Sequence, residues 1–248
     1  MSVTSQYRDA WEGFWSEATE EPGAVFWDAE PALTAGMHLA RYEPLVDDAG
    51  LTMLDLGCGN GTQTRFLADR FPKVMGVDLS AAAIDLAHRQ QALNPGKHPT
   101  GELVFRRFDA VDEELVALLH AEVGDCNVYM RGVLHQTDPP DRQRLVDSIA
   151  VLVGERGRAF VVDLAEAAGA KLGQLAQLPS GPPPKLQPVF RHGLVPGAVT
   201  DEEVAEYFTA AGLTVLISGD LPLTTTEYEA DGSRIQLPSK WVVIGRGA

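Results

Sequence analysis

Short apolar runs alternate with amphipathic segments through the middle of the chain. Apolar runs typical of buried strands lie at residues 52–56, 74–77, 103–108, 126–131 and 159–164. Helical patterns lie between them, at residues 61–70, 81–92, 112–122 and 139–153. Strands that alternate with helices at this spacing predict a parallel sheet with helices on both faces.

The last third of the chain departs from this alternation. Thr200 and Glu203 form a capping box that predicts a helix running to residue 211. Two more strands are expected at residues 213–218 and 241–245, with no helical pattern between them. We therefore expect an antiparallel pair at the sheet edge. The whole pattern predicts a Rossmann-like, doubly wound α/β sheet of seven strands, mostly parallel with an antiparallel edge strand.

The first 48 residues form a predicted helical arm. Aromatic residues recur there at helical spacing, and residues 21–23 break the pattern before a second expected helix at residues 31–46. These aromatic side chains either pack the arm onto the domain or form a lid over a ligand pocket. The candidates for such a substrate pocket are Tyr7, Trp11, Trp15 and Trp27.

Length and composition are those of one globular domain. The 248 residues are 45% hydrophobic and 22% charged, which allows a sizeable core. We divide this domain into an arm at residues 1–48, a ligand-binding core at 49–164, a capping insertion at 165–200 and a closing helix with antiparallel strands at 201–248.

Charge and cysteine content narrow the classes of partner. The net charge is −15, without a basic stripe, so a nucleic acid or an anionic membrane is a poor partner. No apolar run reaches 18 residues, and the N-terminal segment is too polar for a secretory signal. The two cysteines, Cys58 and Cys126, cannot form a disulfide framework or a four-ligand zinc site, and a reducing cytoplasm is the expected compartment.

A glycine-rich turn joins the first strand to the first helix. Gly57, Gly59 and Gly61 allow a tight turn that approaches a ligand closely, and the following helix offers free N–H groups. Asp78 ends the second strand, where a carboxylate accepts hydrogen bonds from a ribose diol. The glycine spacing is G-x-G-x-G, whereas a dinucleotide site needs G-x-G-x-x-G.

Three motifs together resemble a known family. The segment from Asp55 to Gly61 is similar to motif I of the class I S-adenosylmethionine (SAM)-dependent methyltransferases, and Asp78 matches their ribose-binding acid. Residues 108–110 match the segment whose acid meets the adenine amino group, and residues 127–136 match the fourth strand and its "LH" segment. The resemblance is strong over residues 50–165. It implies these cofactor-binding residues: Asp55, Gly57, Cys58, Gly59, Asn60, Gly61, Asp78, Leu79, Asp109, Ala110 and Arg131.

The resemblance implies displacement at the methyl group of SAM, giving S-adenosylhomocysteine, on a small molecule of the ubiquinone-biosynthesis or natural-product kind. The enzyme then mainly aligns the reactants and excludes water. His135 and His192 are the candidate bases, Arg191 is a candidate substrate contact, and no metal site is expected. Asn60 and Gln63 are candidates for the polar end of the cofactor.

Other functions stay open from the sequence. A SAM-binding enzyme of the same fold could act as a cyclase or isomerase without transferring methyl. A scaffold with a vestigial site would not bind SAM, and a nicotinamide-dependent oxidoreductase would bind NADH instead. The sequence does not identify the acceptor, the methylated atom or the oligomeric state.

Overall fold

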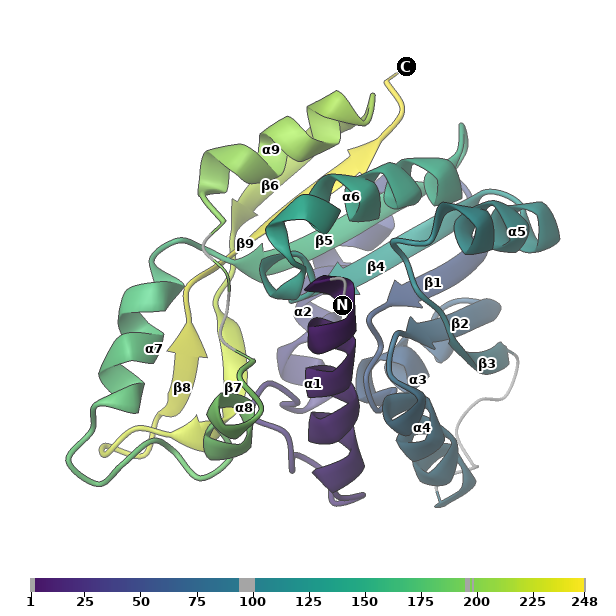
Figure 1. Ribbon diagram of the computed structural model, residues 1–248. Coiled ribbons are helices and arrows are strands. Elements are labelled where there is room, and N and C mark those ends of the chain that lie inside the picture. The colour runs from purple at the N-terminus through teal and green to yellow at the C-terminus, as the bar shows by residue number, and fades with distance from the viewer. Residues whose placement is uncertain (1–2, 94–100, 195–196, 198, 248) are drawn as a thin grey trace.

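A computed structural model describes residues 3–93, 101–194, 197 and 199–247. Its centre is a seven-stranded sheet of order β3-β2-β1-β4-β5-β9-β6 (Figure 1). The strands are β1 (Thr52–Leu56), β2 (Lys73–Asp78), β3 (Glu102–Arg107), β4 (Cys126–Arg131), β5 (Arg158–Leu164), β6 (Thr214–Asp220) and β9 (Ser239–Gly245). The strand order reverses between β1 and β4, which is where ligands bind in folds of this kind.

The predicted antiparallel pair at the sheet edge is confirmed, and it consists of β9 and β6. The antiparallel strand is β9, which pairs with β5 on one side and with β6 on the other. It therefore lies one strand in from the edge, and the edge strand β6 runs parallel to β5. The chain reaches the edge first and returns inward, which periodicity within each strand cannot reveal.

The helices cover both faces of the sheet (Figure 1). One face carries α5 (Glu113–Val123), α6 (Pro139–Val153) and α9 (Asp201–Ala210), and the other carries α2 (Ala35–Tyr42), α3 (Thr62–Ala68) and α4 (Ala81–Leu93). The predicted capping box of α9 is present, with Glu203 N donating to Thr200 Oγ1 and Thr200 N donating to Glu203 Oε2.

Alternation along the strands explains why both faces are buried. Leu54 and Leu56 pack with α5 and α6, whereas Met53 packs with α2 and α3. In the same way, Val128 packs with α5 and α6, and Tyr129 packs with α2 and α3. Successive side chains of a strand point to opposite faces, so a sheet covered on both sides needs a nearly continuous apolar run.

The arm is helical, but its second part differs from the prediction. The first helix, α1 (Val3–Glu17), is followed by η1 (Pro31–Leu33), α2 and η2 (Glu43–Leu45) in place of one helix over residues 31–46. Gln63 from α3 causes the break, because its Oε1 accepts hydrogen bonds from Thr34 Oγ1 and from the amide of Ala35. A side chain thus takes a bond that a continuous helix would have made internally.

The capping region contains elements that the sequence patterns did not predict. Residues 165–200 include α7 (Ala168–Ala176) and α8 (Gln187–Arg191), and β7 (Leu223–Tyr228) pairs with β8 (Arg234–Leu237) as a separate hairpin. Residues 229–233 form the turn of this hairpin, where the amide of Gly232 donates to the carbonyl of Glu229 at 3.0 Å. Figure 1 shows α7, α8 and the hairpin together beside the carboxyl ends of the sheet strands, with α1 next to them. No helix in the described part of the chain is long and apolar enough to cross a membrane.

Candidate active site

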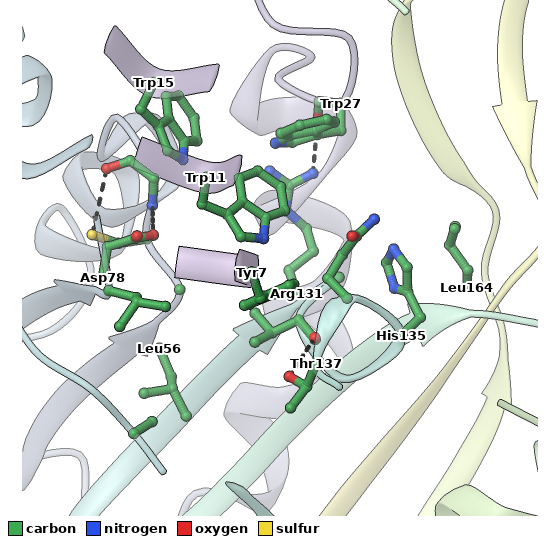
Figure 2. A pocket seen from close by; sticks show the side chains of 18 of the residues that line it. Tyr7, Trp11, Trp15, Trp27, Leu56, Asp78, Arg131, His135, Thr137 and Leu164 are labelled. Carbon is green, nitrogen blue, oxygen red and sulfur yellow. Dashed lines mark hydrogen bonds between the residues drawn. The ribbon is translucent and has the colours of Figure 1, made fainter. Parts of the chain in front are cut away.

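One cavity opens at the carboxyl ends of the parallel strands, where α1 and the capping region face the sheet (Figure 2). Its walls come from the arm, the glycine turn, the ends of β2 and β4, and the hairpin. Of the predicted cofactor-binding residues, those that line it are Gly57, Cys58, Gly59, Asn60, Asp78, Leu79, Asp109, Ala110 and Arg131.

The glycine turn is held against β2 and beneath α1. The amides of Gly57 and Cys58 both donate to the carbonyl of Val77, at 2.8 and 3.0 Å. Gly59 has a φ of 54°, and a Cβ atom there would lie 2.6 Å from the ring of Trp15. The turn therefore needs glycine at this position both for its left-handed backbone and for the tryptophan that covers it.

Asp78 is fixed beside this turn by two backbone donors. Its Oδ2 accepts from Gly59 N and its Oδ1 accepts from Ser80 N, both at 2.9 Å. Burial raises the pKa of Asp78 to about 6, and the charge of Glu12 adds to the rise. A carboxylate has about four acceptor sites, so Asp78 can still accept hydrogen bonds from a ribose diol.

The arm helix closes over the next acidic position. Arg8 of α1 forms an ion pair with Asp109 at 2.5 Å, and Asp109 Oδ1 also accepts from the amide of Val111. Glu12 accepts hydrogen bonds from Ser80 Oγ and from the amide of Ala82 at the start of α4. The helix is thereby tied to the two loops that follow β2 and β3.

A polar corner lies at the opposite side of the glycine turn. Asp28, which the sequence analysis missed, is 6% exposed and accepts hydrogen bonds from Asn60 and Thr62. Arg131 at the end of β4 donates from Nη1 to the carbonyl of Trp27 at 2.8 Å (Figure 2). The corner thus places one carboxylate and one guanidinium in the same wall of the cavity.

His135 is the candidate for a general base in this site. Asp163 at the end of β5 forms a hydrogen bond with Nδ1 of His135 and accepts the amides of Leu134 and Leu164. Such a bond sets the tautomer that leaves Nε2 as an acceptor. The ring lines the cavity, and no residue in the described chain bonds to Nε2. Asp163 was not predicted, although an acid that ends a strand of this sheet was a usable signal.

The other half of the cavity is apolar. Trp11 packs edge to face on Trp27, with ring centroids 5.7 Å apart, and both line the wall with Tyr7 and Trp15 (Figure 2). Side chains from β5, the capping helices and the hairpin complete it, and these are Leu164, Leu172, Leu186, Val189, Phe190, Leu223 and Leu237. The aromatic residues of the arm therefore pack against the domain and wall the pocket at the same time.

Four predicted site residues lie outside this cavity. Asp55 is buried beneath the turn, where it accepts from Thr64 Oγ1 at 2.6 Å, and Gly61 faces Phe105. Arg191, the predicted substrate contact, pairs with Glu17 on the outside of α1 and does not line the cavity.

His192 also faces away from the main cavity, with Nε2 3.1 Å from Glu17 Oε1. It lines a smaller adjoining hollow together with Tyr7 and His135. Both residues after the proline-rich run thus join α8 to α1, because the acid at the end of α1 attracts them.

The cysteine in the cavity wall is Cys58, which is buried. Burial raises the pKa of the Cys58 thiol well above its usual range, which opposes a nucleophilic role. The described residues contain no group of three or more His, Cys, Asp or Glu side chains arranged to hold a metal ion.

The residues of the cavity fit SAM. An acid held beside a glycine turn faces the position expected for a ribose, the guanidinium of Arg131 suits a carboxylate, and the apolar half remains for an acceptor. Strand order, glycine turn and acid together define a class I SAM-dependent methyltransferase.

Comparison with known proteins assigns the family within this class. A model of the thiopurine S-methyltransferase (TPMT) family matches residues 8–211, and the chain belongs to that family. A thiopurine S-methyltransferase of Stutzerimonas stutzeri (strain A1501) is 31% identical over 114 residues, which are 44% of this chain and 48% of that protein. The match therefore spans about half the length of that relative.

Solved structures agree with the fold. A SAM-dependent methyltransferase from Anabaena variabilis ATCC 29413 is 30% identical with a TM-score of 0.86, covering 97% of this chain and 95% of that chain. Magnesium protoporphyrin IX methyltransferase from Synechocystis PCC 6803, with bound SAM, is 14% identical with a TM-score of 0.63 over 100% and 98% of the two chains. The latter shows the shared fold alone.

Proposed function

We propose that this protein transfers the methyl group of SAM to the sulfur atom of a small, neutral, apolar thiol. The observation that supports this most is the single cavity that connects the glycine turn and Asp78 to an apolar chamber. The name of the family and of the relative from Stutzerimonas stutzeri supports sulfur as the acceptor atom. The product is S-adenosylhomocysteine.

The residues mainly position the reactants. When bound, SAM supplies an electrophilic methyl group on its sulfonium sulfur. Asp78 and the glycine turn hold the nucleoside end, and the aromatic wall of Trp11 and Trp27 excludes water and orients the thiol. Alignment of this kind contributes about 7–11 kcal/mol in favourable systems.

His135 accepts the proton of the thiol at Nε2 in this proposal. A thiolate is the reactive form, and a thiol of ordinary pKa is mostly protonated at neutral pH. Asp163 holds the ring and stabilises the imidazolium that forms. Acidic thiols, which ionise in water, need this step less.

The acceptor class follows from the charges around the cavity. Five aspartates line it, and Arg131 is the only Lys or Arg in the described lining: the acids are Asp28, Asp78, Asp109, Asp138 and Asp141. Asp109 and Asp141 are paired with Arg8 and Arg144, whereas the other three acids form no ion pair within the described residues. An anionic acceptor would meet these uncompensated charges, whereas a neutral one would not. We propose no metal, nucleic acid or membrane partner, since displacement at a sulfonium needs no Lewis acid and the net charge is −15. We place the protein in the cytoplasm, where its buried thiols stay reduced.

The test begins with calorimetric titration of SAM, S-adenosylhomocysteine and NADH, followed by thiols with methyl-labelled SAM. We expect micromolar binding of the two sulfur ligands, none of NADH, and labelled thioether with one S-adenosylhomocysteine per turnover. SAM binding without S-adenosylhomocysteine formation from any acceptor would instead support a non-methylating enzyme. Absence of SAM binding would overturn the proposal.

A further inference from the structure

Asp28 is a buried acid that no part of the proposed methyl transfer uses. It lies in the turn that follows α1, where its amide donates to the carbonyl of Val25. Its side chain is 6% exposed and lines the cavity next to the glycine turn. A carboxylate at this depth requires a compensating interaction.

The partners of Asp28 are neutral and unevenly distributed. Its Oδ2 accepts from Asn60 Nδ2 at 2.9 Å and from Thr62 Oγ1 at 2.8 Å. Its Oδ1 has one contact in the described structure, Gln63 Nε2 at 3.5 Å, which is the outer limit of a hydrogen bond. No lysine, arginine or histidine of the described chain forms an ion pair with it, and the nearby charge of Arg65 reaches this corner through a hydrogen bond to Thr62 Oγ1 at 3.3 Å. Oδ1 is therefore available to a donor in the cavity.

A cationic ligand would offset the cost of this buried charge. An isolated buried carboxylate is unfavourable, whereas a carboxylate that forms a charge-assisted hydrogen bond is not. SAM carries an α-ammonium group on its amino acid end. Asp28 is bonded to Asn60 and Gln63, the two side chains that the sequence pattern singles out for that end of the cofactor.

We propose that Asp28 binds the α-ammonium group of SAM and thereby selects ligands that carry the amino acid end. The inference rests on the proposed function, because it takes SAM as the ligand of this cavity. It also gives the arm a part in cofactor binding, since Asp28 connects residues 25–34 to the start of α3.

The experiment compares ligands with and without the ammonium group by calorimetry. The proteins are the wild type, Asp28→Asn, and Glu30→Gln, a control that removes an exposed acid two residues along the same arm. The ligands are S-adenosylhomocysteine, its analogue lacking the α-amino group, and 5′-methylthioadenosine, which lacks the whole amino acid end.

We expect Asp28→Asn to lower the affinity for S-adenosylhomocysteine roughly 10- to 100-fold, which is the range of one charge-assisted hydrogen bond. The affinity of 5′-methylthioadenosine should stay within about twofold, and loss of the amino group should weaken binding to the wild type but not to the variant. Glu30→Gln should behave as the wild type.

Equal losses for all three ligands would mean that Asp28 only supports the turn, and would overturn the proposal. Asp28→Ser is the second variant, because its hydroxyl still accepts a hydrogen bond without the charge. If neither variant folds, equal affinity of the wild type for S-adenosylhomocysteine and its deaminated analogue would overturn it, and unequal affinity would support it. If the wild type binds methylthioadenosine but not SAM, both this proposal and the proposed function fail. If SAM binds and the three ligands lose affinity equally in the variant, only this proposal fails.

Discussion

At the residue scale, the two buried acids at the glycine turn have different roles. Asp78 faces the cavity, while Asp55 lies beneath the turn and bonds to Thr64. The motif predicted both residues but not which of them would face a ligand, because that depends on how the turn folds over the end of β1. The buried charge of Asp55 therefore affects the stability of the folded protein rather than ligand binding.

Replacing Asp55 with Asn should stabilise the protein at alkaline pH. Burial raises the pKa of Asp55 to about 7 from its unfolded value of 3.8. The folded state thus binds the proton more tightly, and stability falls as pH rises between those values. At pH 8 the variant should be more stable by on the order of 3 kcal/mol, with a smaller difference at pH 5. Urea unfolding at both pH values measures this, and a pH-independent difference would contradict it.

Replacing His135 with Asn should reveal whether proton removal matters. Asn can still bond to Asp163, so the loop should keep its position while the base is lost. We expect kcat for benzyl mercaptan to fall about 100-fold, within the usual range for general base catalysis, and kcat for the more acidic thiophenol to fall much less. Equal losses for both thiols would assign His135 a positioning role only.

At the scale of elements, α1 is held by side chains that are far away in sequence. Arg8 reaches Asp109, and Glu12 bonds to Ser80 and the first turn of α4. The spacing of its aromatic residues predicted the helix, and the packing of those residues on the domain is confirmed. The break after residue 33 was not predictable, because the bond that causes it comes from Gln63 of another helix.

Replacing Glu12 with Gln should loosen α1 from the domain. The variant removes a negative charge from the N-terminus of α4, which costs about 1 kcal/mol. Glu20→Gln is the matched control, since Glu20 also contacts α4 through Arg89 but in an exposed ion pair. Hydrogen exchange of residues 8–17 should quicken in the first variant and not in the second. Unchanged exchange in both would show that aromatic packing alone holds the helix.

For the whole molecule, the elements that depend on local sequence patterns could be predicted, and those that depend on contacts between distant segments could not. The alternation of strands and helices over residues 49–164 is confirmed, because each element there shows its own period. The hairpin of β7 and β8 was missed, since Leu223 and Leu237 become buried only against Leu172 and the arm. Most residues predicted to bind the cofactor accordingly line the cavity, whereas most of its apolar lining was not predicted.

The charge of the whole cavity wall should exclude anionic thiols. Wild-type enzyme should prefer thiophenol to 2-mercaptobenzoate by at least about tenfold in kcat/KM, because like charges in a shielded site repel strongly. This preference should become smaller as the salt concentration rises, because salt screens the repulsion between the anionic thiol and the net charge of −15. Equal rates, or a preference for the benzoate, would contradict the proposal that the cavity excludes anionic thiols.

The chamber for the acceptor is built from segments inserted between β5 and β9, outside the alternating core. Residues 165–194 and 221–238 supply much of its apolar wall, whereas the glycine turn belongs to the sheet. Exchange of these two insertions with those of a related chain is therefore a route to new acceptor preference with the cofactor half left intact. The two insertions must be grafted together, because each completes the apolar cluster of the other.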